Sequence, residues 1–471
     1  MIKKFKKIFN TIATALAVST PLIATTSLSS CGDNIDKEFN ADLLFKNLEE
    51  FVNDNSKRFT TSIDEIFAAG WIVNKLMSFD YDKKENISQI PAEINRDDRE
   101  FFMTEGISLQ NFDYQFRGVT ERSTNILLSI PANNATLETK NIILTCHYDS
   151  YISQSWGKSP QPKTQGVTDN ATGVAALLTL AQFFSIYGNN TSYNVQLLFC
   201  GAEESGTNGS RVFSHYFFGY YDPSYRIDPT LKKEVQLWGT TNVDSFEYCI
   251  NLDTLAGGDY VYCFSPWSQM KETWNGDILI NDITYSNWDG SELDSSRCIT
   301  SNKEVSNAIL ETSNKIDLDE KYILSESESL FEMDASCLSY NNIVSNSARL
   351  NLKQEGTDAS DHFAFYVVGI KTANLVSKNV KINMPGAGFN KSQTIDERLW
   401  EYGLKAISQI DSGLDFVIYE SLDYTEERMN GTIWHTELDR FDALEELFGL
   451  EHIKQQFYGA WKSVFKFVLS L

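Results

Sequence analysis

Two adjacent acids, Glu203 and Glu204, follow the apolar run 194–200 (NVQLLFC). Only Gly201 and Ala202 separate them from it. Carboxylates at adjacent positions repel each other, and neither belongs on a buried strand. One explanation is that the pair begins a helix, whose N-terminal dipole favours acidic side chains. The other explanation is that these carboxylates do chemistry, as a metal ligand or as a proton acceptor.

Other acids and one histidine stand in comparable places. His147, with Asp149 two positions on, ends one apolar run, and Asp253 ends another. Asp169 precedes an apolar helical segment. One interpretation is that it is no more than the N-cap of that helix. Carboxylates and imidazole without paired cysteines suit Zn²⁺ or a similar divalent ion. Two ions a few ångströms apart would need one bridging carboxylate and would activate a shared water for hydrolysis.

The elements that must position these residues alternate between strands and helices. This alternation predicts an α/β fold with a mixed, largely parallel central sheet that helices cover on both faces. Function in such sheets gathers beyond the carboxyl ends of the strands, so the candidate residues are expected around one crevice. The strand patterns cover 124–130, 141–146, 194–200 and 247–252, and the helical patterns cover 43–77, 171–187, a segment from about 210, and 438–470.

The N-terminus has the order of a secretory signal. A lysine-rich start precedes an apolar stretch, which ends in Leu-Ser-Ser-Cys at 28–31. This order resembles the bacterial lipoprotein box, so residues 1–30 are predicted to be a signal peptide and Cys31 a lipidated anchor. Residues 31–42 would be a tether. The protein is then expected on the extracellular face of a bacterial membrane, held there by Cys31.

The rest of the chain, 43–471, is predicted to be one domain. Its formal net charge of −24, counted over the whole sequence, argues against nucleic-acid partners, whose phosphates would be repelled. Three stretches rich in polar residues interrupt the alternation and are predicted to form a cap over the domain. They lie near 219–245, 266–350 and 377–428.

Six motifs together resemble the co-catalytic di-zinc exopeptidases of the aminopeptidase Y, bacterial leucyl aminopeptidase and glutamate carboxypeptidase type. They are HYDS at 147–150, GVTDNATGVAALL at 166–178, AEESGTNGS at 202–210, INLD at 250–253, SDHFAFYVVGI at 360–370 and WHTELD at 434–439. The resemblance implies a zinc exopeptidase fold, two Zn²⁺ ions or other divalent ions, and peptide substrates. It also implies a cis peptide bond directly after the bridging aspartate.

The resemblance carries a role to each matching position. His147 and Asp253 would hold one ion, Glu204 and His435 the other, and Asp169 would bridge the two. In addition, Asp149 would hydrogen-bond His147 and fix its tautomer, and Glu203 would be the general base.

The second imidazole ligand is a choice between two of the five histidines. His215 and His452 lie in helical, aromatic-rich segments and are expected to be structural. His435 stands in the HT-x-x-D motif that supplies the ligand in the family, which favours it. His362 and its neighbour Asp361 are expected to shape the substrate pocket or to support the ligands.

These observations predict a surface-anchored, zinc-dependent exopeptidase. The activity expected is that of an aminopeptidase, which hydrolyses N-terminal residues from peptides through a water bridging two metal ions. One alternative is an aminoacyltransferase like glutaminyl cyclase, which shares HYDS, the paired glutamates and a WHT segment but uses a single zinc. Another alternative is a catalytically inactive relative that is retained as a binding surface.

Overall fold

The computed structural model describes the greater part of the predicted domain. The predicted signal sequence, Cys31, the first residues of the tether and most of the three polar insertions lie outside the described residues. The described residues are 39–84, 87, 99–151, 164–218, 241–264, 271–272, 278–280, 283–285, 303–316, 331–333, 360–366, 368–378, 393–394, 396, 399 and 431–471.

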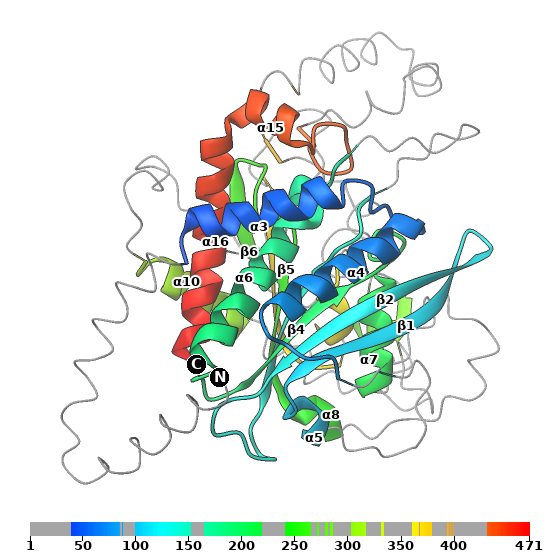
Figure 1. Ribbon diagram of the computed structural model, residues 1–471, viewed down its shortest axis with the longest axis vertical. Helices are drawn as coiled ribbons and strands as arrows, with labels where there is room; N and C mark the ends of the chain where they lie inside the picture. Colours follow the sequence, from blue (N-terminus) through cyan, green and yellow to red (C-terminus); the bar gives the residue numbers. More distant parts are fainter. Residues whose placement is uncertain are drawn as a thin grey trace, which may run out of the picture.

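A mixed sheet of eight strands forms the centre of the molecule, in the order β1-β2-β4-β3-β5-β11-β6-β10 (Figure 1). The middle strands β4, β3, β5 and β11 run parallel to one another, whereas β2 and β6 flank them in the antiparallel sense. The strands are β1 Gly106–Phe116, β2 Val119–Ile130, β3 Asn141–His147, β4 Asn194–Cys200, β5 Phe246–Leu252, β6 Tyr260–Phe264, β10 Phe331–Met333 and β11 Lys371–Lys378. A separate small sheet contains β7 Lys271–Glu272, β8 Ile278–Ile280 and β9 Ile283–Tyr285.

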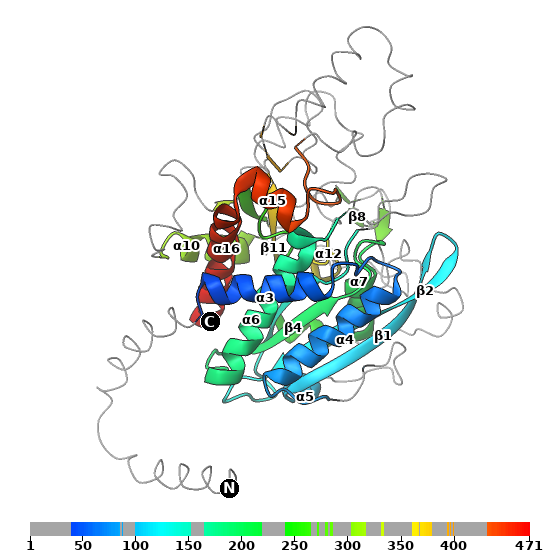
Figure 2. The ribbon, with the colours of Figure 1, turned by 45° about the horizontal axis from the view of Figure 1, so that its top comes forward.

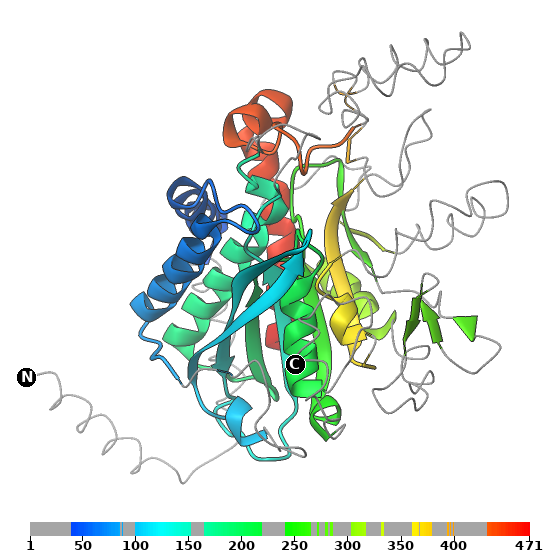
Figure 3. The same ribbon diagram turned by 90° about the vertical axis from the view of Figure 1, so that its right-hand side faces the viewer.

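Helices cover both faces of the large sheet, as the alternating pattern predicted (Figure 3). Successive residues of a strand point to opposite faces, so Ile142 and Leu144 pack into one apolar core and Ile143 into the other. The first face carries α3 Ala41–Asp54, α4 Ile63–Ser78, α6 Thr172–Tyr187, α10 Lys303–Ser313, α15 Phe441–Phe448 and α16 Leu450–Ser470. The second carries α5 Arg99–Phe102, α7 Asn208–Phe218, α8 Thr241–Asp244 and α12 Phe363–Tyr366.

The segment 43–77, which was predicted to be helical, forms two helices, α3 and α4. Helix α3 lies across α6 and α16, which places the N-terminal and C-terminal parts of the described chain side by side (Figures 1 and 2). A short linker between α3 and α4 contains Arg58, which reaches the functional edge of the sheet described below.

Helix α6 is the central helix of the first face, and it begins and ends near the predicted positions. Gly188 ends it with a positive φ of 70°, and its amide donates to the carbonyl oxygen of Phe184. Val167–Tyr187 is also the one segment among the described residues that is long and apolar enough to cross a membrane. Of its most apolar window, 78% is buried inside the protein, so α6 is a core helix.

Candidate metal centre

The carboxyl ends of three neighbouring parallel strands place the predicted residues at one edge of the sheet. Strand β3 lies between β4 and β5 and is parallel to both. It ends at His147, whereas β5 leads directly into Asp253, and β4 leads through Gly201 and Ala202 to the acid pair. Side chains from sequence positions more than 100 residues apart therefore meet because their strands are neighbours.

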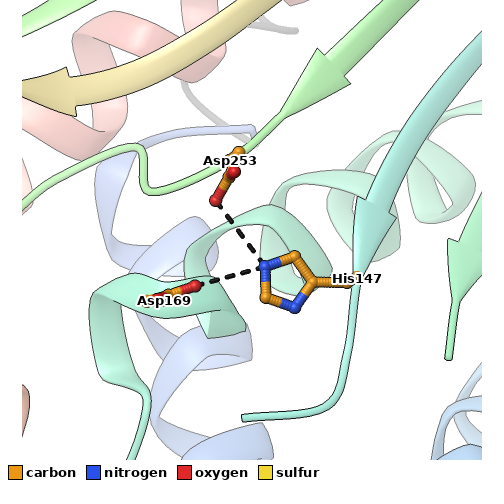
Figure 4. Close-up of side chains that lie close together, drawn as sticks. All are labelled: His147, Asp169 and Asp253. Atoms are coloured by element: carbon orange, nitrogen blue, oxygen red, sulfur yellow. Dashed lines mark ion pairs between the residues drawn. The ribbon is translucent and has the colours of Figure 1, made fainter. Parts of the chain in front are cut away.

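The first cluster contains His147, Asp169 and Asp253 (Figure 4). His147 Nε2 lies 3.2 Å from Asp169 Oδ1 and 3.6 Å from Asp253 Oδ1. The side chains of His147 and Asp169 are only 2% and 7% exposed. One imidazole nitrogen and two carboxylate oxygens thus converge among largely buried side chains.

The second cluster contains Asp169, Glu204 and His435. His435 Nε2 lies 3.1 Å from Asp169 Oδ2 and 3.0 Å from Glu204 Oε2. The imidazole ring of His435 also stacks on the ring of Tyr151, with centroids 4.1 Å apart. Asp169 is common to both clusters, and it presents Oδ1 to one histidine and Oδ2 to the other.

Asp149 connects the histidine at the end of β3 to the acid pair after β4. Its Oδ1 lies 3.4 Å from His147 Nδ1, the ring nitrogen that faces away from the first cluster. The same carboxylate accepts hydrogen bonds from the backbone amides of Glu203 and Glu204, both at 3.1 Å. The acid pair therefore has a buried anchor of its own, and it lies before α7 rather than in the first turn of that helix. The helix-start explanation of the pair is wrong.

The position of Asp169 depends on the turn Val167–Ala171 and not on helix capping. The amide of Asp169 and the Thr168 amide donate to the buried carboxylate of Asp439, at 3.1 and 2.7 Å. Helix α6 begins at Thr172 without a side-chain cap, so the N-cap interpretation of Asp169 is wrong. The peptide bond between Asp169 and Asn170 is cis, as the resemblance implied.

A close approach of α6 to the sheet brings Asp169 to the strand ends. A Cβ at Gly173 would lie 2.5 Å from the carbonyl oxygen of Leu252 and 2.7 Å from Cys146 Cβ, so only glycine fits here. Asn170 fixes the same contact, because its side-chain amide donates to the Leu252 carbonyl oxygen at 2.7 Å. The start of α6 is thus attached to the end of β5, directly before Asp253.

Arg58 supports the loops beneath the centre. Its guanidinium donates to the carbonyl oxygens of Tyr148, Gln165 and Gly166 at 2.7, 2.7 and 2.6 Å. Complete burial lowers its pKa to about 10, so the side chain remains a cation at neutral pH. Sequence reasoning missed Arg58, because a single arginine in a helix linker carries no local signal of this contact.

The centre carries more negative charge than its own residues balance. Burial raises the pKa of Glu204 to about 7, although His435 opposes the shift. Burial, followed by the neighbouring Glu204, also raises the pKa of Glu203 well above its ordinary value. Glu204 Oε1 is buried without a hydrogen-bond partner among the described residues. Divalent cations would satisfy this oxygen and relieve the repulsion, and the donor set of imidazole and carboxylate suits Zn²⁺.

Both clusters line one pocket, which Glu203 lines as well. His362 and Asp361 are not among its lining residues; both are buried, at 3% and 0% exposure. Burial and the charge of Lys378 lower the pKa of His362 to about 3, so this imidazole is neutral. The described lining residues are His147, Asp169, Glu203, Glu204, Asp253, Thr254, Ser360, Asn374, Val376, Lys378, Trp434 and His435.

The segment that contains most of these residues is similar to known proteins. Residues 125–281 match the model of Peptidase family M28. The Peptidase family M28 segment contains every residue of the two clusters except His435. It covers less than half of the chain of 471 residues.

A curated vacuolar membrane protease of Ajellomyces capsulatus is 32% identical over 111 residues, which are 21% of this chain and 10% of that protein. The chain thus matches about a tenth of that relative's length. Among solved structures, a leucine aminopeptidase precursor of Bacteroides thetaiotaomicron is 14% identical with a TM-score of 0.46, over 92% of this chain and 98% of the other. A glutaminyl cyclase of Tannerella forsythia is 12% identical with a TM-score of 0.48, over 92% and 99%.

Proposed function

We propose that the protein is a metal-dependent exopeptidase, an aminopeptidase that removes N-terminal residues from peptides. The observation that supports this most strongly is the placement of the Asp169 carboxylate, with one oxygen toward His147 and the other toward His435. A carboxylate shared between two imidazole-containing clusters is the arrangement that two adjacent metal ions require. The match of residues 125–281 to Peptidase family M28 supports hydrolysis of a peptide bond.

The ligands would divide between two ions, as the clusters do. His147 and Asp253 would hold one Zn²⁺, His435 and Glu204 the other, and Asp169 both. When bound, the ions supply Lewis acidity, which polarises a peptide carbonyl and lowers the pKa of water.

Glu203 is the candidate for moving protons. It lines the pocket, yet it belongs to neither histidine-containing cluster. Asp149 accepts hydrogen bonds from the backbone amides of both glutamates, which fixes the backbone from which the two side chains extend. In the proposed reaction, the Glu203 carboxylate accepts a proton from the attacking water and donates it to the departing amine nitrogen.

Metal content and product identity together test this function. The metal-loaded protein is expected to contain about two zinc ions per chain by elemental mass spectrometry, and to release free amino acids from aminoacyl peptides. Chelation should abolish this release, and added Zn²⁺ should restore it. A fully loaded protein that holds one ion and converts N-terminal glutamine to a pyroglutamyl product would instead support the cyclase alternative. Two bound ions without turnover of any peptide would support the inactive relative.

We also propose that the protein is a lipoprotein anchored through Cys31 on the extracellular face of a bacterial membrane. The order of a basic start, an apolar stretch and Leu-Ser-Ser-Cys supports this proposal. An enzyme held there would act on extracellular peptides and release amino acids small enough for import.

A further inference from the structure

Lys378 places a buried cation in the wall of the pocket. The residue is 8% exposed and lies at the carboxyl end of β11. Its Nζ lies 5.6 Å from the centroid of the Trp434 ring, which lines the same pocket. Among the described lining residues, Lys378 is the one lysine or arginine; the other ionisable ones are acids or the histidines of the two clusters.

The geometry of β11 places Lys378 beyond the metal centre rather than within it. Val376 and Lys378 are two positions apart, so they lie on one face of the strand, and both line the pocket. Leu375 pairs with Leu252 of the parallel strand β5, which puts Val376 level with Asp253. Lys378 is two residues further, which is about 7 Å along a strand. That distance is about the length of two residues of an extended peptide.

The chemistry of a lysine at this place points to an anion. An ammonium group cannot be a ligand for a metal ion, because it has no free electron pair. It does form strong charge-assisted hydrogen bonds with carboxylates, above all where water is excluded. Burial and the charge of Lys378 lower the pKa of His362 to about 3. This imidazole is therefore neutral and does not compete for the same anion.

We propose that Lys378 binds a carboxylate of the substrate, so that the pocket selects peptides with a carboxylate one to two residues from the bond that is cleaved. The inference rests on the proposed exopeptidase function. Two kinds of peptide carry such a group. One has aspartate or glutamate at its N-terminus, and the other is a dipeptide, whose C-terminal carboxylate is close to the scissile bond.

Two substrate pairs, each differing in one carboxylate, test the proposal and separate the two sources. Glutamyl and glutaminyl p-nitroanilide test the side-chain carboxylate; Leu-Gly and Leu-Gly amide test the terminal one. In one pair, Lys378→Met is expected to lower kcat/KM for the carboxylate substrate about 10- to 100-fold and to leave its amide partner unchanged. Lys378→Arg should restore much of the loss. Lys46→Met, at a position whose side chain is 67% exposed, is the control and should change nothing.

Two results would overturn the proposal. One is an equal loss for both members of every pair, which would mean that Lys378 acts on a group common to all peptides, such as the reacting carbonyl. The other is no loss for any substrate.

Binding measurements distinguish failure of this inference from failure of the proposed function. Calorimetry with the zinc-loaded Glu203→Gln protein, with and without Lys378→Met, measures the affinity for Leu-Gly, Leu-Gly amide, glutamate and glutamine. If no peptide is hydrolysed but Lys378→Met still weakens binding of one carboxylate ligand, the proposed function fails and this inference stands. If peptides are hydrolysed without a carboxylate preference that depends on Lys378, the proposed function stands and this inference fails.

Discussion

Asp439 accepts a hydrogen bond from the backbone amide of Asp169 at 3.1 Å, across 270 positions of sequence. Its other carboxylate oxygen accepts from both the amide and the hydroxyl of Thr168, at 2.7 and 2.9 Å. Asp439 is fully buried and belongs to neither metal cluster. It therefore acts on the centre by holding the backbone that presents both oxygens of Asp169.

Replacing Asp439 tests this positioning role. Asp439→Asn keeps the size of the side chain, but turns one acceptor into an NH₂ group that faces an N–H donor. We expect a loss of about 10- to 100-fold in zinc affinity or kcat, the range for residues that orient metal ligands. Competition with a chromophoric chelator measures the affinity. Asp442→Asn is the matched control, because that acid is 72% exposed and pairs with Arg440 on the surface. Equal behaviour of the two variants would contradict the role of Asp439.

The two adjacent glutamates should respond differently to substitution. Glu203→Gln removes the proton acceptor and leaves both clusters intact, so we expect normal zinc content and a loss of turnover of about 10²- to 10⁴-fold. Glu204→Ala removes a proposed ligand, so zinc content should fall toward one ion per chain. Elemental analysis and steady-state kinetics on the same preparations measure both effects. An active Glu203→Gln protein, or a Glu204→Ala protein with two ions, would show that the roles are wrongly assigned.

Zinc affinity should increase with pH, and the increase should continue well above pH 7. Burial opposes the charged form of His435, but Glu204 and Asp169 raise its pKa to about 10 in the metal-free protein. Below that pH, the imidazole carries a proton that must leave before its nitrogen can bind an ion. Zinc binding at pH 7.5 should therefore release protons, and affinity should decline as pH falls. Calorimetry in buffers of different ionisation enthalpy counts the protons. Binding at pH 7.5 without proton release would refute this.

Cys31→Ala should abolish incorporation of a labelled fatty acid and shift the protein from the membrane fraction to the medium or to an unprocessed precursor. The reason is that the lipoprotein box requires a cysteine thiol as the site of acylation. Cys298→Ala, far along the chain, is the control and should keep the label. Labelling that persists in the Cys31→Ala protein would remove the basis for the proposed anchor.

The class of fold could be predicted from the sequence, because strands buried on both faces have a local signature of continuous apolar residues. The same reasoning placed His147, Asp253 and the acid pair at one edge, since the ends of adjacent parallel strands must lie together. The bounds of β3, β4, β5 and α6 lie within one residue of those predicted. The division of 43–77 into two helices was not predicted, although the linker 55–62 is polar and ends in Ser62, whose side chain caps α4.

The sequence by itself thus determined the types of the candidate residues and the strands that carry most of them. The motif resemblance already favoured His435 over His362, and the structure places His435 beside Asp169 and Glu204. Only the tertiary structure placed Asp439 and Arg58 behind the loops. Arg58, His435 and Asp439 lie in loops, where the sequence has no helical or strand periodicity. Their positions depend on contacts between distant segments, such as the hydrogen bond between Thr164 and Asp439 across 275 positions, which form only when the sheet and its helices have packed.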